Sequence, residues 1–316
     1  MSAPAVPQPL DDAGAPSEPR EPGPPSAARA RPAGGTPLTA AYTRLTEVLP
    51  FLAVTELGPA DPLPAGPGWV AAADLAAGGG VLDDFLAWDA GQVRRTYGEE
   101  ARPDVVASFG LHRYAWSACL LVTLPWFLLR RVPRLPLDAV ALHRNADGSR
   151  ARVAARGAGF ACLPDDPAAG LPGARVVAGE EALRAEVRGA VAGHLEPVLA
   201  AFGPRMRRGP RALWGMATDE IVEGLWYLGS LLGEEERAMA ETGLLLPGNG
   251  AGTGPATAPY RGGAAFRTLT GPAGEPLATR DRASCCMYYT LRPEDTCVTC
   301  PRTCDSERVA RLAASA

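Results

Sequence analysis

Apolar side chains recur every three or four residues along much of the chain, which is the spacing of an amphipathic helix. The two longest stripes cover residues 183–202 and 214–232, and Pro197 inside the first predicts a bend. Both stripes are typical of core-facing helices. A shorter stripe of Tyr42, Leu45, Leu49 and Leu52 predicts a helix after the cap Thr36-Pro37. A short helix is predicted at 69–75, ended by the glycines at 78–80, and another helix is capped by Asp83. A long helix is predicted over 103–131.

The most apolar run, residues 116–129, is shorter than the ~20 residues that cross a bilayer, and Pro125 interrupts it. We therefore expect a buried core helix and no transmembrane span. The first residues show no basic start followed by an apolar run, as a secretory signal would. The sequence predicts a cytoplasmic protein and leaves peripheral contact with a membrane open.

The period changes to short alternating or apolar runs at 138–144, 151–157 and 160–163, separated by the turn signal Asn145-Ala146-Asp147-Gly148. These runs predict a small antiparallel sheet of three or more strands. A further strand is expected at 265–270. The fold class is then α+β, mainly helical, with a small antiparallel sheet and a cysteine-rich C-terminal motif.

Composition divides the chain into four parts. Residues 1–35 are rich in Pro, Ala, Gly and charge, and this composition predicts a disordered tail. A helical α+β domain follows over 36–246, and the Gly/Pro-rich residues 247–264 are interpreted as a flexible linker. The C-terminal segment, 265–316, is expected to pack on the main domain.

Charge and glycine motifs exclude several classes of function. The formal net charge of −4 argues against a nucleic-acid-binding protein. The glycines at 248–254 precede no helix, and those at 78–80 lack the Lys and Ser/Thr of a phosphate loop, so no nucleotide site is predicted. His112, His143 and His194 form no metal-binding pair, and His194 is interpreted as a surface or core-edge residue.

Five of the seven cysteines lie in CCMYYTLRPEDTCVTCPRTC, residues 285–304, whereas Cys119 and Cys162 stand alone in apolar surroundings. In a reducing cytoplasm such a cluster indicates metal or redox chemistry. The C-x2-C step suits a chelate, whereas neighbouring side chains point apart in a strand, so the pair Cys285-Cys286 requires a local distortion that the metal itself would stabilise. The spacing leaves three sites open: structural zinc, [4Fe–4S] and [2Fe–2S].

The pattern C-C-x10-C-x2-C followed by Pro301 resembles the C-terminal signature of the FhuF-like siderophore-iron reductases. Looser similarities lie upstream at Trp69–Leu75, 102–116, 194–197 and Leu213-Trp214, so the resemblance covers roughly residues 38–304. It implies a [2Fe–2S] cluster whose ligands are Cys285, Cys286, Cys297 and Cys300. Cys304 lies outside the pattern, as a neighbour of the site or a surface thiol on the last helix.

The resemblance implies an oxidoreductase that transfers one electron to a ferric siderophore and releases ferrous iron. The cluster would be loaded by a ferredoxin or a flavoprotein. Alternatives are a zinc-stapled binding protein without catalysis and an electron carrier to another acceptor. Two groups of arginines stand as candidates for contact with partners or as ordinary solvated charges: Arg280, Arg282, Arg292 and Arg302 around the cysteines, and Arg205, Arg207, Arg208 and Arg211 before the helix of Trp214.

Overall fold

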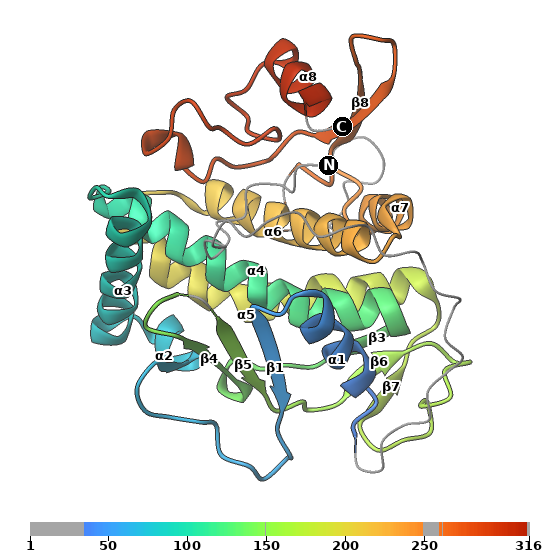
Figure 1. The fold of residues 1–316 in the computed structure, drawn as a ribbon. Coiled ribbons are helices and arrows are strands. Elements are labelled where there is room, and N and C mark those ends of the chain that lie inside the picture. Colours follow the sequence, from blue (N-terminus) through green and yellow to red (C-terminus); the bar gives the residue numbers. More distant parts are fainter. Residues whose placement is uncertain (1–34, 149, 249–258, 261, 315–316) are drawn as a thin grey trace.

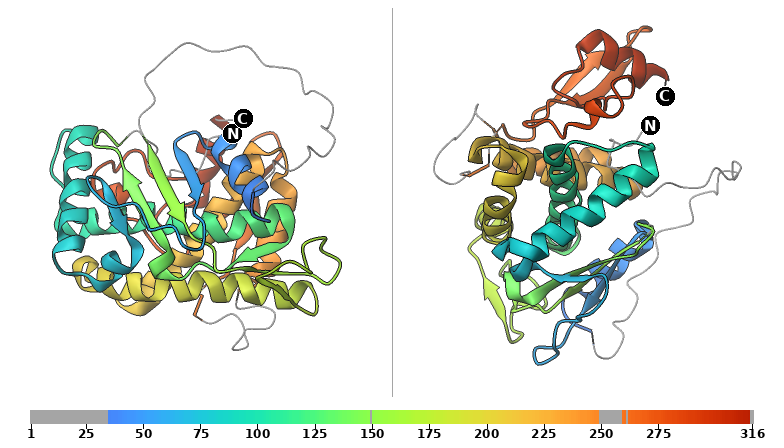
Figure 2. Two further views of the ribbon diagram at one scale, coloured as in Figure 1. Left: turned by 90° about the horizontal axis from the view of Figure 1, so that it is seen from below. Right: turned by 90° about the vertical axis from the view of Figure 1, so that its left-hand side faces the viewer.

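The computed structural model describes residues 35–148, 150–248, 259–260 and 262–314. Nearly all of the predicted tail and most of the predicted linker therefore lie outside the described residues. The described part has three layers, with sheets at the bottom, long helices in the middle and the C-terminal segment on top (Figure 1 and Figure 2). This arrangement confirms the mainly helical α+β class.

Helix α4 (Pro103–Leu129) is the centre of the core and lies between α5 (Glu180–Met206) and α6 (Pro210–Leu231). Pro103 occupies the first turn, where its missing N–H costs nothing. Helix α4 is the one helix in the described ranges that is long and apolar enough to cross a membrane, but 94% of its most apolar window is buried. The prediction of a core helix is thus confirmed.

The strands at 138–163 belong to two sheets, not to the single antiparallel sheet predicted, and a third, two-stranded sheet lies in the C-terminal segment. In the larger sheet β4 (Val140–Arg144) pairs antiparallel with β5 (Ala151–Ala155), as predicted. Strand β5 also pairs in parallel with β1 (Leu52–Glu56), and the order is β1-β5-β4-β2, with β2 at Trp69–Ala71. The third predicted strand, β6 (Phe160–Cys162), belongs instead to a second sheet with β3 (Arg131–Pro133) and β7 (Ala174–Val176).

Several predicted helix boundaries are wrong near the N-terminus. Helix α1 (Thr39–Val48) starts after Thr36-Pro37, and Leu52 opens strand β1. Trp69 lies in β2, and helix α2 covers Ala72–Ala77. Helix α3 (Gly79–Tyr97) starts before Asp83, because Gly78 with φ 77° turns the chain directly into it. Asp83 instead pairs with Arg205.

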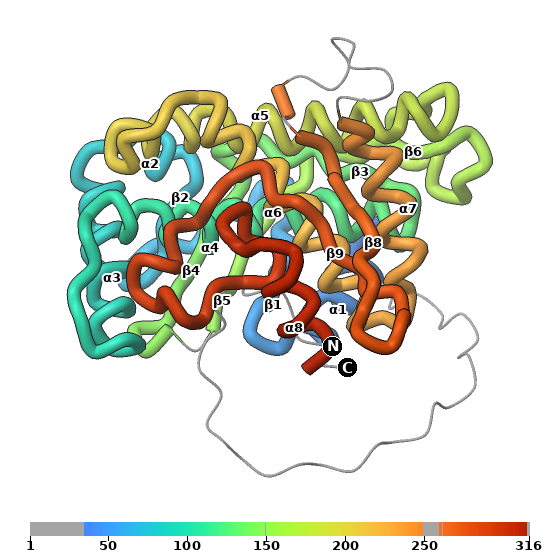
Figure 3. The backbone as a smooth tube through the Cα atoms, turned by 90° about the horizontal axis from the view of Figure 1, so that it is seen from above, coloured from blue at the N-terminus to red at the C-terminus, as the bar shows by residue number. Residues whose placement is uncertain are grey.

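The C-terminal segment rests on α6 and α7 (Glu235–Leu245) and reaches across to α3 (Figure 3). It contains the predicted strand β8 (Phe266–Thr270), its partner β9 (Pro276–Arg280), the short helix η3 (Tyr288–Thr290) and helix α8 (Asp305–Ala314). In the predicted linker, Tyr260 is buried, stacks edge-on against Trp214 and donates a hydrogen bond to the carbonyl of Arg188. Another short helix, η1 (Leu137–Ala139), precedes β4.

Candidate metal centre

The four predicted ligands lie together in the loops between β9 and α8. The thiol of Cys300 interacts with the thiols of Cys285 and Cys297. The thiols of Cys285 and Cys297 lie near Cys286 and act to raise the pKa of Cys286. These four neighbouring thiols are called the ring of thiols below; Cys300 is buried, and the others are half-buried.

The four thiols of the ring differ in pKa. Interaction with Cys300 lowers the pKa of Cys285 to about 5 and that of Cys297 to about 6, while burial opposes both shifts. The same two contacts raise the pKa of Cys300 far above its usual range. Burial raises the pKa of Cys286 to about 11, against the effect of Arg282. The lowered pKa values of Cys285 and Cys297 favour their thiolate form, which is the form of cysteine that binds metal.

The adjacent pair is turned inward by the protein. Met287 takes the left-handed conformation with φ 68°, and its N–H points at the sulfur of Cys285 over 3.4 Å. On the other side, the hydroxyl of Ser108 on α4 donates to the carbonyl of Cys286 over 2.9 Å. Contacts within the chain therefore help to hold this turn, in addition to the stabilisation expected from a metal.

Asp219 on α6 fixes the segment that leads into this pair. Its carboxylate is fully buried and accepts hydrogen bonds from the backbone N–H groups of Ala283 (2.9 Å) and Ser284 (2.8 Å). It also accepts one from Arg280 over 2.7 Å. Gly215, one turn earlier on α6, lets the chain approach, since a Cβ there would lie 3.1 Å from the carbonyl oxygen of Ala283. The cysteine loop is thus docked on α6 by a buried carboxylate.

Apolar contacts hold the other side of the loop. Met287 and Leu291 pack with Val93 of α3 and with Val105 and Phe109 of α4, forming a small core of their own. This cluster covers the end of the α3–α4 pair and is separate from the main core. The loop therefore bridges three helices, which restrains the ring of thiols from both sides.

The arginines that flank the cysteines divide into two kinds. Arg280 is fully buried between Asp219 and Glu223, and Arg282 is buried near Asp219. The acidic residues raise the pKa of Arg282 further above its usual range, although burial opposes this. These two are not ordinary solvated charges, because carboxylates of α6 bind them beneath the ring. Their positive charge would stabilise an anionic centre.

The remaining two lie at the surface. Arg292 pairs with Glu99 over 2.8 Å. Arg302 is exposed and lies over the ring of Tyr289 at 4.0 Å. Cys304 is an exposed thiol that precedes α8 and lies 3.2 Å from the hydroxyl of Ser306, outside the ring of four.

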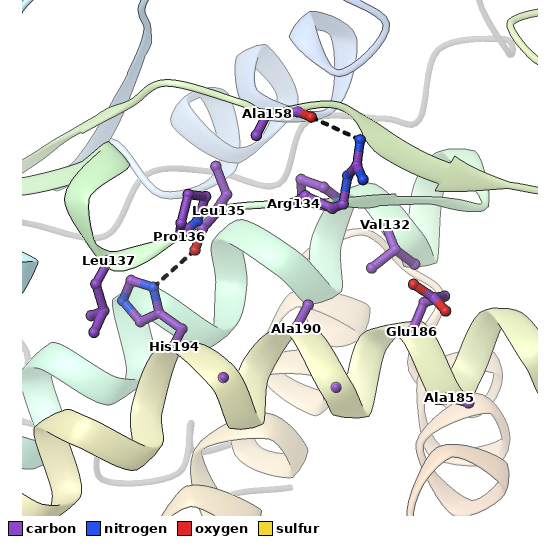
Figure 4. Close-up of a pocket in the computed structure, with 13 residues that line it drawn as sticks. Val132, Arg134, Leu135, Pro136, Leu137, Ala158, Ala185, Glu186, Ala190 and His194 are labelled. Carbon is purple, nitrogen blue, oxygen red and sulfur yellow. Dashed lines mark hydrogen bonds between the residues drawn. The ribbon is translucent and has the colours of Figure 1, made fainter. Parts of the chain in front are cut away.

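Both buried histidines have partners within the chain. His112 pairs with Glu220 inside the core. His194 was predicted at the surface or the core edge, but it is buried, with Tyr114 and the carbonyl of Leu135 as hydrogen-bond partners. Burial lowers the pKa of His194 below its usual value. His194 also lies at the edge of a pocket of about 630 Å³ between α5 and the chain after β3 (Figure 4), which is distant from the cysteines.

The donor set fits an iron–sulfur centre. No three His, Cys, Asp or Glu side chains within the described ranges converge tightly enough to hold a single metal ion. The ring nevertheless gathers four thiols, with the buried guanidinium of Arg282 beside Cys286 and Cys297. Four thiolates are the ligands of a [2Fe–2S] cluster, and an adjacent cation offsets its negative charge.

Two residues that position the site were not predicted from the sequence. Asp219 and Ser108 position the cysteine loop over long distances in sequence, and no local motif marks them. One signal was available, because Asp219, Glu220 and Glu223 interrupt a stripe of apolar residues at positions that face inward on α6. Buried acidic residues require partners, and a search for arginines to match them would have indicated Arg280 and Arg282.

Comparison with known proteins supports the cluster. Residues 282–302 match the FhuF 2Fe-2S C-terminal domain. The match includes Cys285, Cys286, Cys297 and Cys300 and ends before Cys304. No curated protein matches the chain. Over residues 282–302 the chain is thus similar to the FhuF 2Fe-2S C-terminal domain, which supports a C-terminal motif for a [2Fe–2S] cluster.

Proposed function

We propose that this protein reduces the iron of a ferric siderophore by one electron, with Cys285, Cys286, Cys297 and Cys300 as ligands of its cluster. The observation that carries the proposal is the match of residues 282–302 to the FhuF 2Fe-2S C-terminal domain, together with the ring that the four thiols form. We further propose that the protein works in the cytoplasm and receives its electrons from a ferredoxin or a flavoprotein.

When bound, a [2Fe–2S] cluster accepts and donates one electron at a time. The chain contributes position and charge. Asp219 and Ser108 hold the loop of Cys285 and Cys286, and the Arg282 guanidinium lies near Cys286 and Cys297. Positive charge near the site favours the reduced, more negative state and raises the reduction potential.

The position of the loop suits a large acceptor. The C-terminal segment forms the outer layer of the described structure (Figure 2). The side chain of Cys285 is half-buried. A ferric chelate therefore need not enter the core in order to approach the thiol ring. Hard oxygen ligands hold Fe(III) more tightly than Fe(II), so one-electron reduction loosens the iron from its chelator.

Two other functions share part of this evidence. A ring of four thiols is also a donor set for structural zinc, which would make the protein a stapled binding module. The same cluster would serve an electron carrier whose acceptor is not a siderophore. Visible absorption distinguishes the zinc alternative from the iron–sulfur protein, because a zinc protein is colourless and a [2Fe–2S] protein absorbs visible light.

Anaerobic stopped-flow tests the proposal. Protein reduced by dithionite and freed of excess reductant is mixed with ferric hydroxamate, catecholate and citrate chelates, in the presence of a chelator that reports ferrous iron. We expect the cluster to reoxidise and about one ferrous iron to appear per electron held. An intact, reducible cluster that no class of ferric chelate reoxidises would leave the role of electron carrier to another acceptor.

A further inference from the structure

Positive charge is distributed unevenly around the ring of thiols. Seven arginines lie within residues 262–314, and six of them have a carboxylate within 4.0 Å. Arg302 is the exception in that described segment. It lies over the ring of Tyr289 at 4.0 Å and interacts with the thiol of Cys285.

Further arginines without a carboxylate within 4.0 Å among the described residues lie at the junction of α5 and α6, and one of them, Arg208, acts on the same thiol. Arg208 is half-buried and acts electrostatically on Cys285. Arg207 and Arg211 are exposed in the same turn, and the described residues offer no carboxylate within 4.0 Å of these three guanidinium groups. Arg205 alone in this turn is paired, with Asp83.

On the inner side of the ring of thiols, the arginines are paired with carboxylates. There Arg280 and Arg282 face Asp219 and Glu223, so each positive charge is matched within the chain. On the side of Cys285, Arg302 and Arg208 act on the thiol, and neither has a carboxylate within 4.0 Å among the described residues. A cationic surface without internal partners, beside a half-exposed thiol, is suited to an anionic ligand.

We infer that Arg208 and Arg302 form an acceptor-binding surface at Cys285 that selects ferric chelates carrying net negative charge. The inference rests on the proposed function, which supplies the ferric chelate. Guanidinium groups donate charge-assisted hydrogen bonds to carboxylate or phenolate oxygens, and Tyr289 holds the Arg302 side chain in place from one face. One electron passes from the reduced protein to Fe(III), giving Fe(II), and no bond of the chelator breaks.

Three chelates with one iron centre isolate the effect of charge. Ferrioxamine B carries a free ammonium, its N-acetyl derivative is neutral, and its N-succinyl derivative is anionic, while the three hydroxamates around the iron are the same. The gallium forms of these chelates cannot be reduced, so their dissociation constants report binding without electron transfer. We expect the anionic gallium chelate to bind about tenfold more tightly than the cationic one at low salt, and this preference to vanish at about 1 M salt.

Variants test whether Arg302 and Arg208 cause the preference for the anionic chelate. Arg302→Gln and Arg208→Gln should each remove most of the preference, and Arg302→Lys should keep it. Arg134→Gln is the matched control, because Arg134 is exposed directly after β3, outside the C-terminal segment, and its loss changes the net charge equally. Equal binding of the three gallium chelates, or a preference that survives both Gln variants, would overturn the inference.

The ferric chelates separate this result from the proposed function. If all three reoxidise the reduced protein at equal rates, the inference fails and the reductase stands. If none does so while the gallium chelates show the predicted preference, the surface stands and the reductase fails. A potentiometric titration of Arg302→Gln completes the test, because a shifted potential with an unchanged order of chelates would mean that Arg302 tunes the cluster and does not select the acceptor.

Discussion

Replacing Asp219 by Asn removes one buried charge and keeps the size of the side chain. The carboxylate accepts hydrogen bonds from Arg280 and from the N–H groups of Ala283 and Ser284, at 2.7 to 2.9 Å, and it is fully buried. The amide keeps one acceptor oxygen and turns an NH2 group toward donors. Arg280 is left with Glu223, and at least one backbone N–H loses its partner.

The magnitude follows from two known costs. Breaking a buried ion pair by neutralising one partner costs about 3–5 kcal/mol. A buried donor left without an acceptor costs about 1–3 kcal/mol, but both costs describe the same carboxylate and do not simply add. We therefore expect Asp219→Asn to lower the stability of the docked loop by about 3 kcal/mol, which is roughly a hundredfold in the opening equilibrium.

Hydrogen exchange of the metal-free protein measures this opening locally. The amides of Ala283 and Ser284 should lose about a hundredfold in protection in Asp219→Asn, and iron content after purification should fall. Glu47→Gln serves as the control, because Glu47 pairs with Arg44 in an exposed position, where such a pair is worth less than about 1 kcal/mol. If Asp219→Asn keeps wild-type protection and full iron content, the argument that α6 docks the cysteine loop is refuted.

Three further predictions address other parts of the structure. Cys300→Ser should lose most of the cluster's visible absorption, whereas Cys304→Ser should keep it, and the opposite result would show that the ligands are assigned wrongly. Gly215→Val should lower iron content by pushing the backbone at Ala283 away from α6, since even a Cβ would lie 3.1 Å from that carbonyl; unchanged iron content would contradict this. Burial lowers the pKa of His194, so the unfolded chain binds its proton first and stability should fall as pH drops below about 6.5. Urea unfolding from pH 7.5 to 5.5 should show this loss in the wild type and less of it in His194→Gln, and equal slopes would argue against a neutral buried His194.

The long helices could be predicted from the sequence because each carries its own periodic signal. The stripe at 183–202 and the run that begins at Pro103 correspond to α5 and α4. Strands β1 and β2 were missed because they have five and three residues and continue the spacing of neighbouring helices. Strand β6 was predicted as a strand, but its sheet depends on pairing with β3 and β7, which no local pattern specifies.

The site was predictable to a similar extent. The resemblance to the FhuF signature implied Cys285, Cys286, Cys297 and Cys300 as ligands without the fold, and the structure places these four in one segment between β9 and α8, because they are close in sequence. The charges beneath the loop were not predictable, since Arg280 and Asp219 are 61 residues apart and each alone resembles a surface residue. The turn of Cys285 and Cys286 depends on Met287 in a left-handed conformation, which a non-glycine residue rarely adopts.

The central claim is that this loop holds a [2Fe–2S] cluster that passes one electron to a ferric siderophore. The most direct measurement is a titration of one anaerobic sample, with iron, acid-labile sulfide and zinc determined first and the reduced state followed by electron paramagnetic resonance. We predict about two irons and two sulfides per chain, no zinc, and a signal of one unpaired electron that disappears as about one equivalent of ferric siderophore is added and ferrous iron appears. Stoichiometric zinc without sulfide, or a signal that persists after every ferric siderophore is added, would contradict the claim.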